Sequence, residues 1–154
     1  METGNLLIDA QTAFARQRRR ARRERAISWL RRRPAACTRL ASLEATLGAA
    51  PPAARRPAGV QAIPIETIVG TAEPAKSRVF DRAFRAPGAS RQRWERLWMA
   101  SRRGTSIPPI AVFRVCDQHF VDDGHHRVSV AHAIGMKSID AEVIELTAEA
   151  CQGG

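Results

Sequence analysis

The sequence predicts an α+β fold: a small mixed β-sheet with packed helices, preceded by an arginine-rich helical extension. Runs of β-prone residues alternate with amphipathic stretches that carry helix-capping residues at their ends, which is typical of this class. A chain of 154 residues, 44% hydrophobic and 26% charged, suits one globular core plus an appendage. The net charge of +10 is uneven, because residues 1–60 hold 13 basic and four acidic side chains whereas residues 61–154 hold 12 and 11.

The extension, residues 1–48, is predicted to begin with a long amphipathic helix. Its apolar stripe recurs at helical spacing and consists of Leu6, Leu7, Ala10, Ala13, Phe14 and Ala21. Ile27, Trp29 and Leu30 fall off this stripe, so the helix either kinks or uses a second face before Pro34 stops it.

A shorter helix is predicted over residues 38–47, with Gly48 as its cap. Residues 49–59 are predicted to form a linker, because they contain three prolines. A folded domain over residues 60–148 and a tail over residues 149–154 complete the predicted organisation.

Ten arginines cluster on the extension within an 18-residue window, and the candidates for contact with nucleic acid are Arg16, Arg18, Arg19, Arg20, Arg22 and Arg23. Such a cluster can neutralise phosphates without reading sequence, so nucleic acid is a candidate partner of residues 1–34. Two alternatives stay open. The helix can be a solvated one that packs its stripe on its own domain, or it can meet an anionic membrane surface.

Within the domain, strands are predicted near residues 61–69, 109–115, 119–122 and 139–145, and helices near 91–103 and 126–134. Ser90 is the expected N-cap of the first helix, which should bury Trp94, Leu97 and Trp98. The solvent or ligand side of that helix then holds Arg91, Arg93, Arg96, Arg102 and Arg103. Gly135 should end the second helix.

The turn between the predicted strand at Phe120 and the helix that starts at His125 is the candidate site. An Asp-Asp-Gly turn before a helix directs free backbone N–H groups and the positive end of the helix dipole at one point, which favours a phosphate. Gly124 allows close approach, Arg127 can grip phosphate oxygens, and His125 and His126 add donors whose charge can follow pH. The alternative is an ordinary turn whose arginine pairs with an aspartate.

The stretch from residue 60 to residue 146 resembles the N-terminal domain shared by ParB partition proteins and sulfiredoxin. The resemblance lies in an opening strand, a helix that ends in Arg103-Gly104, the strand Ile107 to Phe113, a Gly-x-x-Arg turn, a helix and a last strand, in that order. The form Asp-Gly-His-His-Arg is closer to small bacterial ParB-domain proteins than to partition ParB.

The resemblance implies that Gly124, His125, His126 and Arg127 bind nucleotide phosphates, and that a nucleoside triphosphate, CTP or ATP with Mg²⁺, is the ligand. It also implies an arginine contribution near the first strand, for which Arg82 and Arg85 are substitutes. Sulfiredoxin carries its nucleophilic cysteine directly after the turn glycine, where this chain has His125, so sulfiredoxin chemistry is not expected. The helix-turn-helix and dimerisation regions of ParB are not expected either.

Two functions are compatible with these residues: a nucleotide-binding module that acts as a switch or weak NTPase, and a kinase of small, serine-like metabolites. A kinase needs a carboxylate base, for which Asp122 and Asp123 are the main candidates, with Glu66 and Glu73 as further ones. Asp123 can instead cap the following helix. No dedicated metal site is expected, although Cys116 and His119 have ligand spacing.

The chain is expected to be cytoplasmic, because its start is acidic and it contains no apolar run near the roughly 18 residues of a membrane span. Three scattered cysteines, Cys37, Cys116 and Cys151, favour reduced thiols over a disulfide framework.

Overall fold

A six-stranded mixed sheet forms one layer of the molecule, which confirms the predicted α+β class. The computed structural model describes residues 3–34, 38–49, 51–148 and 151. The strands are β1 (Ala41–Ser42), β2 (Ala54–Pro64), β3 (Ile68–Thr71), β4 (Ile110–Val115), β5 (Gln118–Asp123) and β6 (Ser138–Thr147), and their order in the sheet is β1-β3-β5-β4-β6-β2. The pairs β4–β5 and β2–β6 are antiparallel and the other three are parallel.

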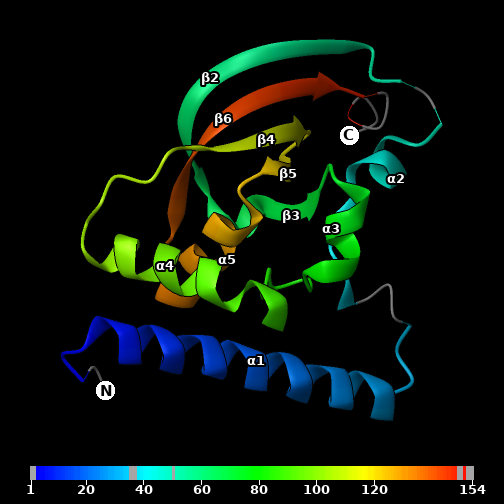
Figure 1. Ribbon diagram of the computed structural model, residues 1–154. Helices are drawn as coiled ribbons and strands as arrows, with labels where there is room; N and C mark the ends of the chain where they lie inside the picture. The colour runs from blue at the N-terminus through cyan, green and yellow to red at the C-terminus, as the bar shows by residue number, and fades with distance from the viewer. Residues whose placement is uncertain (1–2, 35–37, 50, 149–150, 152–154) are drawn as a thin grey trace.

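Two further layers are helical (Figure 1). The inner layer consists of α3 (Pro74–Val79), α4 (Arg91–Arg102) and α5 (His125–Ile134), and the outer layer is α1 (Leu6–Leu30), which lies along α4. The short helix α2 (Leu43–Leu47) and two 3-10 turns, Ile65–Thr67 and Gly88–Ser90, complete the described elements. Among the described residues, no helix is long and apolar enough to cross a membrane.

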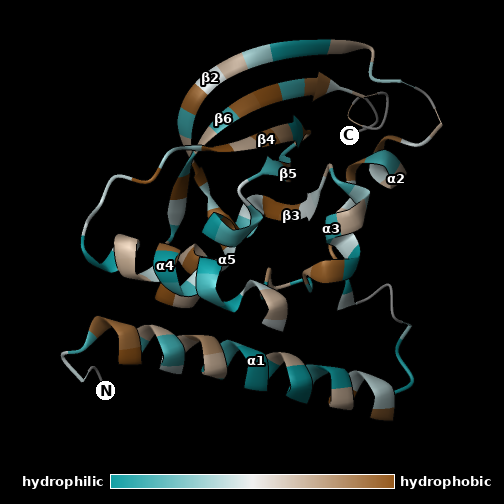
Figure 2. Cartoon of the chain, viewed as in Figure 1, coloured by the Kyte–Doolittle hydropathy of each residue, from teal (hydrophilic) through white to brown (hydrophobic). Residues whose placement is uncertain are grey.

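The extension helix packs on the domain through most of the stripe that the sequence predicts, although Leu7 remains exposed. Ala10, Phe14 and Ala21 are buried, and the Phe14 ring meets Trp94 of α4 edge-on at 5.4 Å. Gln17 is buried with them, and its Oε1 accepts a hydrogen bond from the Ala86 backbone N–H at 3.2 Å. Figure 2 shows the hydrophilic middle of α1, where the arginines lie. Trp29, beyond the stripe, stays 79% exposed.

Three predicted boundaries are wrong. The predicted linker contains the first half of β2, from Ala54, because Pro57 lies in an edge strand next to a bulge at Gly59, where the ladder tolerates a missing N–H. The predicted helix over 38–47 starts only at Leu43, because Ala41–Ser42 pairs with β3. The predicted strand 61–69 is the end of β2, a 3-10 turn and the start of β3.

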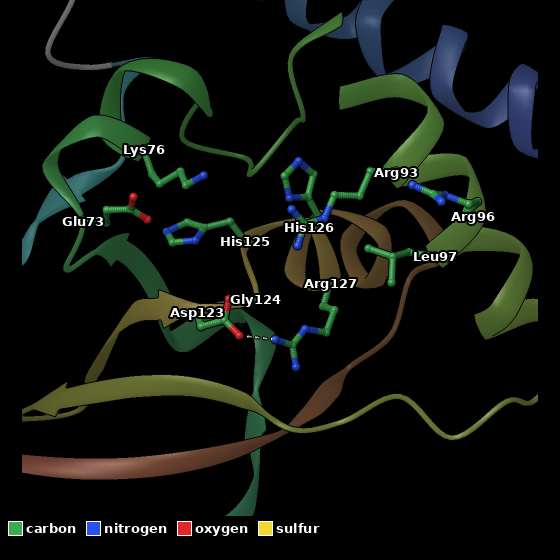
Figure 3. Close-up of a pocket in the computed structure, with 10 residues that line it drawn as sticks. All are labelled: Glu73, Lys76, Arg93, Arg96, Leu97, Asp123, Gly124, His125, His126 and Arg127. Atoms are coloured by element: carbon green, nitrogen blue, oxygen red, sulfur yellow. Dashed lines mark hydrogen bonds and ion pairs between the residues drawn. The ribbon is translucent and has the colours of Figure 1, made fainter. Parts of the chain in front are cut away.

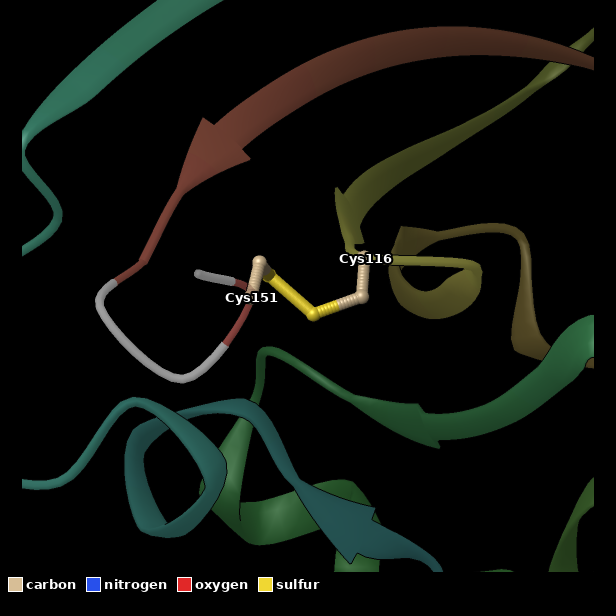
Figure 4. Close-up of a disulfide and its surroundings, with 2 residues drawn as sticks. All are labelled: Cys116 and Cys151. Carbon is tan, nitrogen blue, oxygen red and sulfur yellow. A yellow bond between two sulfur atoms is a disulfide. The ribbon is translucent and has the colours of Figure 1, made fainter. Parts of the chain in front are cut away.

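The cysteines also differ from the prediction. Cys116 and Cys151 form a disulfide that joins the β4–β5 turn to the segment after β6 (Figure 4). The expectation of reduced thiols is therefore wrong for this pair, and Cys116 is not available as a metal ligand. Cys37 and most of the predicted tail, residues 149–150 and 152–154, lie outside the described residues.

Candidate functional site

The turn at Gly124 joins β5 to α5 as the sequence predicts, and its backbone accepts only glycine without distortion. Gly124 adopts a left-handed conformation with φ +108°. A Cβ built on it would lie 2.5 Å from Cγ2 of Ile110 and 2.8 Å from Cβ of the same residue. The sequence predicts that a ligand approaches this glycine closely. In the structure β4 makes that close approach instead, and this contact fixes where α5 begins.

The helix α5 starts without a side-chain cap. The N–H groups of its first turn have no intrahelical acceptor, and the dipole adds partial positive charge at this end. Asp123 does not cap the helix, because its Oδ2 accepts a hydrogen bond from Arg127 Nη2 at 2.5 Å. The predicted cap role of Asp123 is therefore wrong.

His125 and His126 are buried at the start of α5 and are held apart from solvent by Phe80, whose ring both histidines contact. His125 Nε2 lies 2.7 Å from the hydroxyl of Thr71. Burial first, and neighbouring positive charges second, lower the pKa of each histidine to about 4. Both rings are therefore neutral at pH 6, and their charge changes only in more acidic solution in the free protein.

The ring of His126 has a buried polar atom whose hydrogen-bonding capacity the described residues leave unsatisfied. His126 is 9% exposed, and its buried Nε2 has no hydrogen-bond partner within the described part of the chain. A buried ring nitrogen without a partner costs free energy, commonly about 1–3 kcal/mol. A ligand that hydrogen-bonds to it would recover that cost.

A pocket of about 360 Å³ opens over this helix start, between α3 and α4. Figure 3 shows the His126 ring between the side chains of Lys76, from α3, and Arg93, from α4. Four basic and two acidic residues line the pocket, namely Lys76, Arg93, Arg96, Arg127, Glu73 and Asp123, together with Leu97, Gly124, His125 and His126. The positive excess and the helix start favour an anion.

The structure brings only some of the sequence-predicted site residues together. Gly124, His125, His126, Arg127 and Asp123 line the pocket, whereas Asp122 does not. Arg85 is occupied elsewhere, because its guanidinium donates to both carboxylate oxygens of Glu24 at 2.6 and 2.7 Å and to Asp81 at 3.3 Å. Arg82 is also remote from the pocket. Glu73 lines it, and Glu66 does not.

Lys76, Arg93 and Arg96 line the pocket instead of Arg82 and Arg85, for which the sequence predicts that role. The two arginines belong to the ligand side predicted for α4, spaced i and i+3 on one face. Lys76 lies far from the Gly124 turn in the sequence and reaches the pocket because α3 packs beside β3.

No family model and no curated protein matches the chain. Among solved structures, one that matches is the crystal structure of sulfiredoxin from Arabidopsis thaliana. That match has 20% sequence identity and a TM-score of 0.40, and it covers 55% of this chain and 82% of that chain. A likeness this distant carries no argument about activity, and the resemblance to ParB-type domains stays a prediction.

The contacts of Arg127 indicate a structural role. Its Nη1 donates to the carbonyl oxygens of Pro108 and Pro109 at 2.8 and 2.6 Å, in addition to the Asp123 contact. These bonds tie the start of α5 to the segment before β4. The guanidinium therefore has most of its donors satisfied without a ligand.

We expect Arg127→Ala to lower the free energy of unfolding by about 1–3 kcal/mol, because two carbonyl oxygens lose a charge-assisted donor. Anion binding should change less than stability, since Lys76, Arg93 and Arg96 remain. Thermal melting and calorimetric titration of the same variant separate the two effects. An unchanged melting temperature with lost binding would instead assign Arg127 to the ligand.

Acid should destabilise the protein between pH 6.5 and about pH 4. The unfolded chain takes up a proton on His125 and His126 near the ordinary pKa of 6.5, whereas the folded protein resists protonation until about pH 4. Each histidine then contributes a slope of up to about 1.4 kcal/mol per pH unit in that window and none above it. Urea unfolding over a pH series checks this. His126→Gln should show a shallower slope, and equal stability at both ends of the window would contradict the expectation.

Proposed function

We propose that the protein binds the phosphate groups of a nucleotide in the pocket over the start of α5. The observation that carries the proposal is the unpartnered, buried Nε2 of His126 between two cationic side chains. With its Nε2 protonated, a neutral imidazole donates one hydrogen bond to a phosphate oxygen, and Lys76 and Arg93 balance the phosphate charge.

The size of the pocket also supports a phosphate ligand. At about 360 Å³ it lies at the small end of ligand sites, which suits a phosphate chain better than a whole nucleotide with its base enclosed. Mg²⁺ carried by a nucleoside triphosphate would meet the Glu73 carboxylate at the pocket wall, since Asp123 is held by Arg127. Glu73 is then also the carboxylate best placed for the alternative function, a kinase of small metabolites.

The experiment titrates ATP, CTP, GTP, UTP and inorganic pyrophosphate into the full chain by calorimetry, with and without Mg²⁺. We expect the Arg93→Gln/Arg96→Gln double variant to bind the preferred ligand roughly 10- to 150-fold more weakly, as for a lost charge-assisted contact of about 1.5–3 kcal/mol. The matched control is Arg19→Gln/Arg103→Gln, which removes the same charge at exposed positions outside the pocket.

Equal losses in both double variants would overturn the proposal, because binding would then follow net charge alone. The proposal would also fail if neither the triphosphates nor pyrophosphate bound. A nucleotide that binds and is consumed, with phosphate appearing on a serine-like acceptor, would identify the kinase alternative. Slow release of inorganic phosphate alone would identify an NTPase.

A further inference from the structure

A second basic groove lies on the other side of α3, where the C-terminal half of α1 faces the segment around Phe80. It has a volume of about 570 Å³. Its arginines come from four separate parts of the chain and are Arg25, Arg33, Arg39, Arg78 and Arg82. Residues as far apart as 25 and 82 converge there only because α1 packs against the domain.

The acidic side chains of this groove offset only part of its positive charge. Glu24 and Asp81 line it, and both bind Arg85, which belongs to a different pocket, so the two carboxylates and that one guanidinium leave a single negative charge against the five arginines. None of the five groove arginines forms an ion pair with another residue that the structure describes. The groove therefore has several positive charges available to a partner.

An exposed aromatic residue follows directly after the part of α1 that lines the groove. Trp29 is 79% exposed and follows Ser28, which lines the groove, and it lies four residues after Arg25 on the same face of α1. Arginines beside an exposed aromatic ring are the combination that holds single-stranded nucleic acid, whose phosphates meet the cations and whose bases stack on the ring.

The same helix is poorly suited to a membrane surface. An interfacial helix needs a continuous apolar face, but Ala10, Phe14 and Ala21 of α1 are buried against the domain. What remains exposed is split between Leu7 and Ile8 at one end and Ile27, Trp29 and Leu30 at the other. A duplex is also disfavoured, because its stacked bases cannot reach Trp29.

We propose that the groove between α1 and α3 binds single-stranded nucleic acid, with the groove arginines on the phosphates and Trp29 stacked on a base. This site is independent of the phosphate pocket over α5. It also extends the expectation drawn from the sequence, which placed nucleic acid on residues 1–34, because Arg39, Arg78 and Arg82 of the groove lie outside that segment.

The test measures binding of a fluorescein-labelled oligothymidylate by anisotropy, from low to physiological salt. Arg25→Gln/Arg78→Gln removes two phosphate contacts, so the slope of log affinity against log salt should become shallower by about 1.4, at roughly 0.7 per contact for single strands. The control, Arg19→Gln/Arg23→Gln, removes equal charge from α1 outside the groove and should leave the slope unchanged.

Trp29→Ala should weaken binding roughly 5- to 150-fold without changing the salt slope, because stacking on a base does not involve counterions. Trp94 and Trp98 are buried, so quenching of tryptophan fluorescence by the oligonucleotide should disappear in this variant. Melting curves of every variant verify folding.

Three outcomes overturn the proposal. The first is a control variant that lowers the slope as much as the groove variant does, which would mean a general charge effect. The second is a Trp29→Ala variant that binds the oligonucleotide as tightly as the unaltered protein does. The third is a protein that binds anionic phosphatidylglycerol vesicles but not the oligonucleotide, and whose groove variant loses the binding to vesicles. That result would identify a membrane surface as the partner.

Discussion

Gly124→Ala is expected to destabilise the protein by about 2–5 kcal/mol, because left-handed strain of about 1–2 kcal/mol adds to overpacking of about 1–3 kcal/mol. The added methyl group would press on Ile110 of β4, from 2.5 Å. For a chain of this size we expect a melting temperature lower by roughly 4–20 °C. Calorimetric melting provides the measurement.

Gly135→Ala is the matched control for this effect. Gly135 also has a positive φ, +81°, but a Cβ there would meet no atom within 4 Å. It should therefore show the conformational strain alone. If the two variants lost equal stability, the close approach of the turn to β4 would not be what demands glycine at position 124.

The second large effect is expected from loss of the disulfide. Replacing both Cys116 and Cys151 by serine should lower the free energy of unfolding by about 3–4 kcal/mol. The reason is that the bond closes a loop with a sequence separation of 35 residues, so its loss raises the conformational entropy of the unfolded chain. Melting curves should shift downward by roughly 6–16 °C.

A chain with Cys37→Ser alone is the control, since it removes a thiol without touching the disulfide. The reduced form of the unaltered protein should melt like the double serine variant. If reduction left the melting temperature unchanged, the bond would not restrict the unfolded chain in the expected way.

The elements that the sequence predicts well have local signals. The helix α4 and the strands β4 to β6 lie within one or two residues of the prediction, because periodicity and the glycine turns at Gly104 and Gly135 mark their ends. The first half of β2 was missed because prolines are read as breakers, whereas an edge strand tolerates them. Whether a strand lies at the edge of the sheet depends on tertiary structure, and no local sequence pattern predicts it.

The residues of the candidate site likewise fall into those that local sequence predicts and those that depend on tertiary packing. The Gly124 turn and its two histidines were predicted from adjacent residues, while the cations around them come from α3 and α4 and depend on packing. Burial explains the remaining difference. The pKa of a histidine reflects how it is enclosed, and the enclosure by Phe80 and Thr71 joins parts of the chain that are far apart in sequence.

The order of the sheet has a consequence for synthesis on the ribosome. Among the described strands, β2 pairs with β6 alone, so in a nascent chain that already contains β2 this partner is missing until Ser138–Thr147 has emerged. An unpaired strand edge in a waiting chain is a hazard for aggregation. The features that disguise β2 in the sequence, namely Pro57, the bulge at Gly59 and the charges of Arg55 and Arg56, also make it a poor template for other chains during that wait.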